Sequence, residues 1–501
     1  MIRVRMAAVI IGLAGACLVA RADEAGLSRL LPLLSADPDI ICAATAARQL
    51  IEKSQPLVEA AWRSAGSEDP EADAKRVAAD AKSLGVGAVV AWVEKDGWTV
   101  AIDAKAGRDE IAGRLKTYGT FSETRDLWTL RPPRARLPLY AAWRGGVLFF
   151  STSPARVRSA GAGNAAFAGW MKSADALQAD LVLYQTRGAL WKALLDLPAG
   201  PLWRRFSAAL GFDAAIAQPV FINIGLGDGT LSVDLFAAMP SAPPDAVRRA
   251  LLPPLLLADR GMALSVAGLP PAAILDGVAA AEERFDADAG KEFQEELADL
   301  NRDLGFDLRK DLLACLCDWT LAVAPSDDGL PVWSLAVRLD SPERFLASAR
   351  RLAEFAEAGW AEGPEYRDAR QFTTSAFTAP LSLAVRPEWL VMASSPDRLK
   401  QTTDWVLAPQ PASVAPNVVW AIDARIHLGG MGILAMQCLP LRRVPAWFGK
   451  FGPGSAATLS ARRTERQLAV RVRLTAVSLQ ELTALAVLRD EGPRPPKWRQ
   501  P

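Results

Sequence analysis

The stretch PLYAAWRGGVLFFSTSPARV at residues 138–157 decides the fold, because it returns without a gap as PLSLAVRPEWLVMASSPDRL at residues 380–399. The match, at a spacing of 242 residues, pairs Pro138 with Pro380, Arg144 with Arg386, Leu148 with Leu390 and Ser153-Pro154 with Ser395-Pro396. A repeated match at a fixed spacing is the sequence signature of internal duplication. The chain is therefore predicted to contain one structural unit twice.

Three further matches occur in the same order along the two halves. They pair LLPLLSADPDIICAATA from Leu30 with LLPPLLLADRGMALSVAG from Leu251, AVVAWVEKDGWTVAID from Ala88 with WTLAVAPSDDGLPVWSLAVR from Trp319, and FINIGLGDGTLSVDLF from Phe221 with TLSARRTERQLAVRVRL from Thr458. Most of the matched blocks consist of two apolar, alternating segments around a polar turn. This pattern predicts antiparallel β-hairpins.

The segments between the hairpins have helical spacing. Phe293, Leu297, Leu300 and Leu304 form one apolar stripe, which we expect to face a sheet; Phe345, Ala349, Leu352 and Phe355 repeat the pattern after Ser341-Pro342. The predicted fold class is α+β, with two tandem copies of a unit whose antiparallel hairpins and sheets pack against helices on one face.

The expected domains follow from these matches and from the prolines at 240, 243 and 244, which mark the boundary between the copies. We predict a signal peptide at residues 1–22, a first α+β unit at 23–240, a second at 241–477, and a C-terminal helix with a disordered tail at 478–501.

The N-terminus has the pattern of an export signal. Arg3 and Arg5 precede an apolar run over residues 6–20 and a small-residue cleavage site at Ala20-Arg21-Ala22. The run is too short for a transmembrane helix, so we expect a periplasmic or secreted protein without a membrane span. An alternative is a lipid anchor at Cys17, which would hold the protein only together with a second membrane contact.

Charge and cysteine content exclude several classes of protein. Without residues 1–22 the chain has 54 basic and 56 acidic residues, a balance that argues against nucleic-acid binding. Four cysteines in 479 residues are too few for a disulfide scaffold, and whether any of them pair stays open. The four are Cys42, Cys315, Cys317 and Cys438; Cys315 and Cys317 are expected to pack on one face of a strand.

Serines that precede a proline are expected to have a structural role and not to act as nucleophiles. Ser153, Ser395 and Ser341 each stand before a proline at a strand-to-helix transition, where a serine caps the helix. There is no G-x-S-x-G elbow in the sequence. His427 is the only histidine and is expected beside a helix or in a loop.

Nucleotide, metal and carboxylate chemistry have equally little support. Gly225 to Gly229 fall in a hairpin and Gly161 to Gly163 follow a short helix, so neither cluster has the context of a phosphate loop. The acidic run from Glu282 to Asp303 is expected to be the solvated face of a helix. We therefore assign no catalytic, cofactor-binding or metal residues and expect no cofactor.

Tryptophans are frequent in the predicted hairpins. They are Trp92, Trp98, Trp143, Trp319, Trp333 and Trp389. Large rings usually fill interfaces between sheet and helix. We expect these residues in the core, with an aromatic row on one sheet surface as the alternative.

The motif GFDLRKDLL at residues 305–313, placed between a helix and a hairpin, resembles a broad group of uncharacterised exported bacterial proteins with duplicated α+β units. The first half of the chain lacks a clear counterpart of this motif. The group brings no established activity, so the resemblance implies no functional residue.

These observations favour a non-catalytic envelope protein that binds a protein, glycan or lipid partner on its sheets. One alternative is a carrier that holds an apolar ligand against a curved sheet. Another is a hydrolase that uses carboxylates distant in the sequence.

Overall fold

The computed structural model describes residues 24–36, 38–44, 55, 59, 69–94, 97–124, 126–131, 138–158, 163–177, 179–186, 218–227, 230–239, 261–285, 287–327, 329–374, 381–386, 388–408, 418–438, 451–452 and 454–477. The chain divides into one unit of residues 1–187, 219–235 and 476–501 and a second unit of residues 188–218 and 236–475. The predicted signal peptide, Cys17, the proline-rich boundary and the C-terminal segment 478–501 lie outside the described residues.

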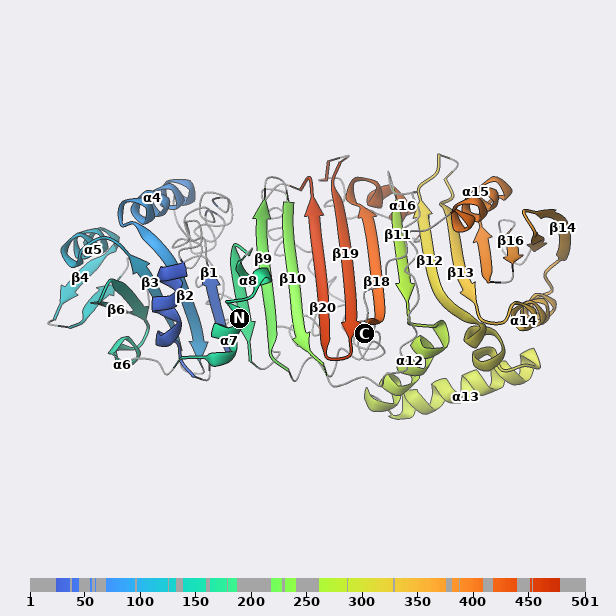
Figure 1. Ribbon diagram of the computed structural model, residues 1–501, viewed down its shortest axis with the longest axis horizontal. Helices are drawn as coiled ribbons and strands as arrows, with labels where there is room; N and C mark the ends of the chain where they lie inside the picture. The colour runs from blue at the N-terminus through green and yellow to red at the C-terminus, as the bar shows by residue number, and fades with distance from the viewer. Residues whose placement is uncertain are drawn as a thin grey trace, which may run out of the picture. The chain divides into compact units, whose positions relative to one another are not determined.

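The first unit alternates strands with short helices. Its described elements are α2 (Glu24–Leu30), η1 (Leu31–Leu33), β1 (Ile40–Ala44), α4 (Pro70–Ser83), β2 (Val86–Glu94), β3 (Gly97–Ala104), α5 (Arg108–Leu115), η2 (Lys116–Tyr118), β4 (Thr120–Glu123), β5 (Trp128–Arg131), β6 (Leu139–Arg144), β7 (Val147–Ser151), α6 (Pro154–Arg158), α7 (Ala165–Trp170), α8 (Ala174–Leu177), β8 (Leu181–Gln185), β9 (Val220–Gly227) and β10 (Thr230–Ala238). Its sheet has the strand order β10-β9-β8-β1-β2-β3-β7-β6-β5-β4, and the pairs from β9 to β4 are antiparallel (Figure 1).

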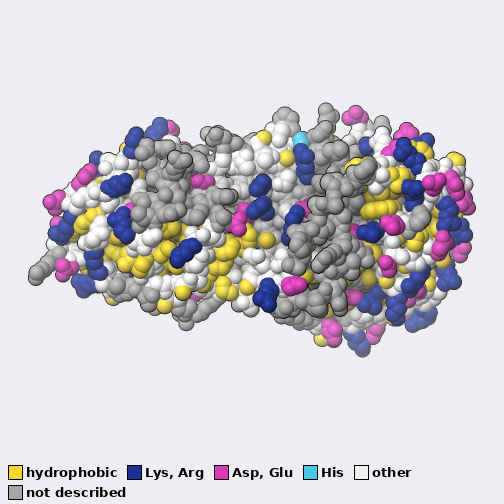
Figure 2. All heavy atoms as spheres, in the orientation of Figure 1, with side chains coloured by type: hydrophobic (Ala, Val, Ile, Leu, Met, Phe, Trp, Pro, Cys, Tyr) yellow, Lys and Arg dark blue, Asp and Glu magenta, His cyan; other side chains and the backbone are white. Residues whose placement is uncertain are grey.

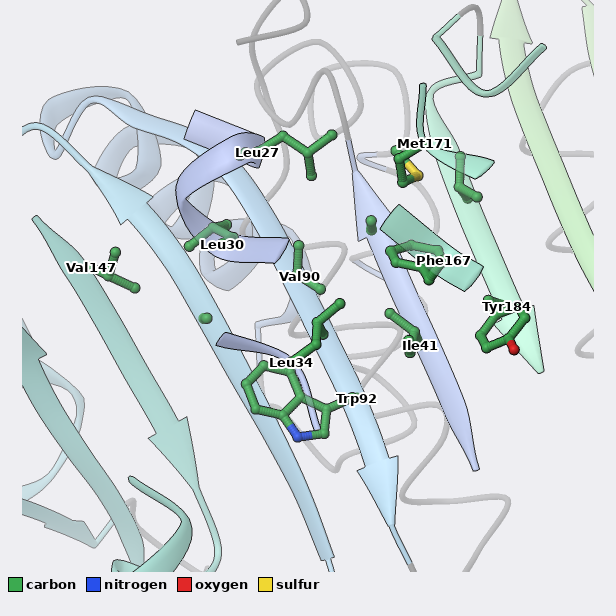
Figure 3. Close-up of a cluster of buried hydrophobic side chains, with 14 of the residues drawn as sticks. Leu27, Leu30, Leu34, Ile41, Val90, Trp92, Val147, Phe167, Met171 and Tyr184 are labelled. Atoms are coloured by element: carbon green, nitrogen blue, oxygen red, sulfur yellow. The ribbon is translucent and has the colours of Figure 1, made fainter. Parts of the chain in front are cut away.

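Helices cover both faces of this sheet, so the expectation of helices on one face is wrong. Val89 and Ala91 of β2 pack in one core with α5, whereas Val90 and Trp92 pack in another with α2 and α7 (Figure 3). Successive side chains of a strand point to opposite faces. The two cores therefore lie on opposite sides of β2, and both sides exclude water.

The second unit repeats this alternation with longer helices. Its described elements are β11 (Met262–Ala267), α12 (Pro271–Phe285), α13 (Ala287–Leu304), the π-helical turn η3 (Leu308–Leu312), η4 (Leu313–Cys315), β12 (Leu316–Ala324), β13 (Val332–Leu339), α14 (Pro342–Phe355), β14 (Trp360–Tyr366), β15 (Ala369–Thr374), β16 (Leu381–Arg386), β17 (Trp389–Ala393), α15 (Pro396–Leu407), β18 (Val418–His427), η5 (Leu428–Gly430), α16 (Met431–Cys438), β19 (Ala456–Thr464) and β20 (Gln467–Thr475). Its strand order is β20-β19-β18-β11-β12-β13-β17-β16-β15-β14, with antiparallel pairs (Figure 1). This is the order of the first unit when β1 is matched with β11 and each later strand in turn.

The match extends to single residues. A row of cross-strand partners in the first unit contains Phe221, Tyr184, Ile41, Trp92, Thr99, Ser151 and Tyr140. The corresponding row in the second unit contains Thr458, Arg425, Ala263, Ala322, Ser334, Ala393 and Ser382. The pair at the end of each row, Tyr140 and Ser382, lies 242 residues apart, which is the spacing of the ungapped match.

Helices also pack on both faces of the second sheet. Val337 of β13 lies in a core with Phe345 of α14, whereas its neighbour Ala336 lies in a core with Leu399 of α15. The class α+β is thus confirmed for the chain. No helix among the described residues is long and apolar enough to cross a membrane.

Two predicted helical stripes differ from the structure. The stripe on α13 was expected to face a sheet, but α13 lies against α12 and α14, and Leu300 is 37% exposed. On α14 the stripe is buried only at its start, because Phe345 is buried whereas Phe355 is 51% exposed. Helical spacing identifies an apolar side but does not tell which element covers it.

Candidate functional site

Strands β18, β19 and β20 carry four exposed arginines on one side of the second sheet. We call this side the arginine face and define it by Arg425, Arg462, Arg471 and Arg473. The register places Arg425, Thr458 and Arg473 in one row across the three strands. Figure 2 shows basic side chains over these strands.

The alternation of β20 explains why these arginines face solvent. Leu468, Val470 and Val472 alternate with Ala469, Arg471 and Arg473. Because a strand has a period of two, one side receives the branched apolar residues and the other the arginines. Leu468 is fully buried. Because it fixes the apolar side of β20 against the core, the arginines on the opposite side of the strand face solvent.

Small and hydroxylated side chains separate the guanidinium groups. Ser460 lies opposite Arg471 and Thr458 opposite Arg473. With strands about 4.8 Å apart and residues about 3.4 Å apart along a strand, the Cα atoms of Arg471 and Arg473 are about 7 Å apart, and those of Arg425 and Arg473 about 10 Å. The face is thus an array of arginines with hydroxyl groups between them.

Asp423 is the acidic residue that β18 contributes to these rows. Its Oδ2 atom lies 4.0 Å from Nη2 of Arg462, and both side chains are partly exposed. A contact of this length at a surface contributes little, because solvent screens it. Asp423 therefore neutralises little of the positive charge of Arg425, Arg462 and Arg473.

An apolar helix follows the strand that bears Arg425. β18 ends at His427, η5 follows, and α16 begins at Met431. Gln437 fixes α16, because its side chain donates to the Ser326 carbonyl at 2.6 Å and accepts from the Ser326 amide at 3.2 Å. Leu434 is buried, but Ile433 is 50% exposed. An exposed apolar side chain therefore lies on the helix that follows β18 in the chain.

The serines that the sequence singled out begin helices. The hydroxyl of Ser395 accepts from the Arg398 amide at 3.3 Å, as expected of a cap. Ser341 occupies the same position before α14, but its side chain makes no capping bond, so that part of the expectation is wrong. Ser153 accepts the Val157 amide with its backbone carbonyl at the start of α6.

Alanine substitutions at Ser395 and Ser341 distinguish a serine that caps its helix through the hydroxyl from one that does not. Ser395→Ala is expected to lower the free energy of unfolding by about 1 kcal/mol, because an orphan amide loses its acceptor. Ser341→Ala is the matched control, with an expected loss below about 0.5 kcal/mol. Chemical denaturation of the two variants measures the difference, and equal losses would contradict the assignment.

His427 serves the local backbone. Its Nδ1 atom accepts from the Gly430 amide at 3.0 Å and so caps the short helix η5. Its place beside a helix agrees with the sequence-based expectation. The histidine side chain lies on the same side of β18 as Arg425, two residues away along the strand.

The described cysteines are buried. Cys42, Cys315 and Cys317 are unpaired thiols, and the side chain of Cys438 lies outside the described residues. The expectation that Cys315 and Cys317 share a strand face is wrong, because the helical turn η4 ends at Cys315 and β12 begins one residue later. Burial raises the pKa of the Cys42 thiol to about 12.

Alkylation of Cys42 is expected to be very slow in the folded protein. At pH 8 a thiol with a pKa near 12 is about one part in ten thousand thiolate, and only the thiolate reacts. Iodoacetamide treatment followed by peptide mass spectrometry, with and without guanidinium chloride, measures the rate. The denatured chain is the control, and equal rates in both conditions would refute a buried thiol.

The glycine clusters and the acidic run found in the sequence lie in or beside regular secondary structure. Gly225 and Gly227 lie in β9, while Gly163 directly precedes Asn164, which caps α7. The described acidic residues of α13 are exposed, as expected for a solvated face; they are Asp288, Glu292, Glu295, Glu296, Asp299 and Asp303. No group of three or more His, Cys, Asp or Glu side chains in the described ranges could hold a metal ion.

The hairpin tryptophans contact the cores rather than forming an exposed row. Trp92 and Trp98 are buried. Four others are partly buried against neighbouring clusters: Trp143, Trp319, Trp333 and Trp389. The expected core placement therefore agrees with the structure for these six residues.

Comparison with known proteins adds little. No protein-family model and no curated protein matches the chain. Among solved structures, crystal form I of TP0453 is similar over 43% of this chain and 80% of that chain, with 11% sequence identity and a TM-score of 0.29. A likeness this distant carries no inference about function.

Proposed function

We propose that the protein is a non-catalytic binding protein of the bacterial cell envelope that holds an anionic envelope component on its arginine face. The observation that carries the proposal is the array of four exposed arginines across three adjacent strands. Guanidinium groups suit this task because they stay charged and donate paired hydrogen bonds to phosphate and carboxylate.

The proposal includes internal duplication. The two strand orders are the same, and the cross-strand rows correspond residue by residue. Tyr184 and Phe221 of the first unit correspond to Arg425 and Thr458 of the second. Duplication of one ancestral unit explains why strands of the two units, which are distant in the sequence, pair with the same register.

The two copies differ at the corresponding surface. In the first unit Trp170, which ends α7, stacks on Phe221 with ring centroids 4.4 Å apart and donates to Asn223 at 3.2 Å. In the second unit the corresponding strands carry exposed arginines. One copy therefore uses this side of its sheet for packing, and the other offers it for binding.

Export is the second part of the proposal, supported by the basic and apolar residues 1–22. Deletion of residues 2–22 should leave the protein in the cytoplasm of a bacterial host. Fractionation and mass spectrometry of the mature N-terminus test this. A start near Asp23 indicates cleavage, an acylated Cys17 indicates an anchor, and envelope localisation of the deleted chain would refute export by this segment.

Retention on an anionic resin tests binding by the arginine face. The net charge is only +1, so strong retention requires that the positive charge be gathered on one surface. Arg425→Gln with Arg473→Gln should elute at lower salt than the parent. The matched control is Arg302→Gln with Arg350→Gln, which removes two exposed arginines from α13 and α14. Equal elution of both double variants would refute the proposal.

A further inference from the structure

We infer that the second sheet binds the hydrocarbon chain of a lipid on the side opposite the arginine face. The surface lies on β11, β12, β13 and β17, and we call it the apolar band. It is defined by seven partly exposed side chains: Met262, Leu264, Leu321, Val323, Trp333, Leu335 and Met392. Binding there is separate from the proposed function, because the arginines lie on the other side of the sheet.

Strand pairing brings these seven side chains together. One row of successive cross-strand partners contains Leu264, Leu321, Leu335 and Met392, and the next row contains Met262, Val323 and Trp333. The row of Arg425 contains Ala263, Ala322 and Ser334, which alternate with the band residues along their strands. Since successive side chains of a strand point to opposite faces, the apolar band and Arg425 lie on opposite sides of the sheet.

A helix covers the part of this side that adjoins the apolar band. In the next row, Val337 and Leu390 are buried in one core with Phe345 of α14. Trp333 and Leu335 pack against the rim of that core and remain partly exposed. The other border of the band is the end of the sheet, where β11 and β13 begin. The apolar band is therefore an open continuation of a closed core.

The first unit closes the corresponding surface. The equivalent rows match Ala91 with Leu321, Trp98 with Trp333 and Val100 with Leu335. The three residues of the first unit are buried in one core with Ile111 of α5, whereas their counterparts in the second unit are partly exposed. Two sheets with the same strand order thus differ in whether this side is covered.

The side chains of the apolar band favour hydrocarbon. None of the seven is charged, and the polar atom among them is the indole nitrogen of Trp333. An extended peptide would lose hydrogen bonds to water there without replacing them, whereas a chain of methylene groups has none to lose. Met262 and Met392 are unbranched, so they adapt to the shape of a bound chain.

The size of the apolar band fits one chain rather than a second copy of the protein. With strands about 4.8 Å apart, the band spans about 14 Å from β11 to β17, and one acyl chain spans about 15 Å, half of the hydrocarbon core of a bilayer. A residue on one side of a sheet occupies about 33 Å², so the seven cover about 230 Å². Apolar neighbours in the same rows of β18, β19 and β20 bring the area to about 430 Å². A stable protein interface needs about 800 Å² from each partner.

The expected affinity follows from the burial of hydrocarbon. Each CH₂ group removed from water strengthens binding about four-fold, so a chain longer by two CH₂ groups should bind about fifteen-fold more tightly. Added salt should not weaken this binding, whereas it screens the attraction of an anion to arginines.

Displacement of the uncharged fluorescent probe N-phenylnaphthylamine from the full chain measures this affinity. The competitors are octanol, decanol and dodecanol, which should bind about fifteen-fold more tightly at each step. Leu321→Gln with Leu335→Gln should weaken dodecanol binding about fifteen-fold, because contacts with about two CH₂ groups are lost. The matched control is Leu300→Gln with Leu352→Gln, which changes two exposed leucines of α13 and α14 and should bind like the parent. Comparing variants of the same chain cancels any contribution from its apolar N-terminus.

Two further measurements guard against loss of folding. Leu321→Met with Leu335→Met keeps an apolar surface of similar volume and should retain most of the affinity. Circular dichroism of each variant establishes that it is folded. In the unsubstituted chain, a dodecanol that carries a diazirine should label residues 316–339 on irradiation, and peptide mass spectrometry locates the adduct.

Each outcome decides between the proposals. Equal affinities for the three alcohols, equal losses in the two glutamine double variants, or labelling confined to other segments would overturn the hydrocarbon site. A dimer that dodecanol dissociates, detected by analytical ultracentrifugation, would assign the band to a second copy and overturn it as well. Arg425→Gln with Arg473→Gln should bind dodecanol like the parent, so the alcohol assay and the resin assay fail independently.

Discussion

The Trp128→Ala variant is expected to lose about 3 to 5 kcal/mol of unfolding free energy, because it leaves a large cavity in the first unit. Trp128 is 1% exposed and lies in the core beneath α5. Its ring lies 6.0 Å from that of Phe121, and its Nε1 donates to Glu123 at 2.9 Å. Truncation removes this packing and leaves the Glu123 carboxylate without that donor.

Trp128→Phe is the control for this prediction. It keeps an aromatic ring in the core but loses the hydrogen bond and part of the volume, so we expect a loss of about 1 to 2 kcal/mol. Denaturation followed by circular dichroism avoids interference from the other tryptophans. A loss below about 1 kcal/mol for Trp128→Ala would show that the site is not a packed core.

Gly268→Ala is expected to cost about 3 to 4 kcal/mol in the second unit, because two penalties add. Gly268 has a φ of +70°, where a residue with a Cβ atom loses about 1 to 2 kcal/mol. An added Cβ would also lie 2.4 Å from the carbonyl oxygen of Val419. That overlap forces the backbone apart at the end of β11, where the Gly268 amide donates to Asp318 at 2.9 Å.

Gly305→Ala separates the two penalties. Gly305 has a φ of +69°, but an added Cβ would meet no atom within 4 Å. Only the conformational penalty applies, so we expect a loss of about 1 to 2 kcal/mol. The difference between the variants in urea denaturation measures the steric cost, and the same loss for both would refute the close approach at Gly268.

The hairpins could be predicted from the sequence because they rest on local chemistry. Alternation of apolar and polar residues has a period of two, and the turns carry residues that accept unusual backbone angles. The ungapped match at 242 residues fixed β6, β7, β16 and β17 as corresponding strands, and the same register holds in both pairs.

The placement of helices on both faces was missed, although β2 contained a signal. Its residues 88–93 read AVVAWV, an unbroken apolar run. A strand covered on one face alternates, whereas a strand covered on both faces is apolar throughout. The run therefore indicates two covered faces and distinguishes β2 from the alternating hairpins elsewhere in the chain.

The arginine face was missed for a different reason. Arg471 and Arg473 alternate with valines and could have been noticed as an exposed side of a strand. Arg425, however, is far from them in the chain and joins them only through the pairing of β18 with β19. A charge cluster that strand pairing brings together can be recognised only once the cross-strand partners are known.

The corresponding rows of cross-strand partners in the two units also predict which substitutions the protein tolerates. Tyr184 is buried beneath helix α7, so substitutions there disturb folding directly. Its counterpart Arg425 faces water, and changes there leave the second core untouched. Under the proposed duplication and binding function, the surface around Arg425 is free to vary, whereas the surface around Tyr184 is constrained by packing. A saturation mutagenesis screen should accordingly find a permissive landscape around Arg425 and a restrictive one around Tyr184.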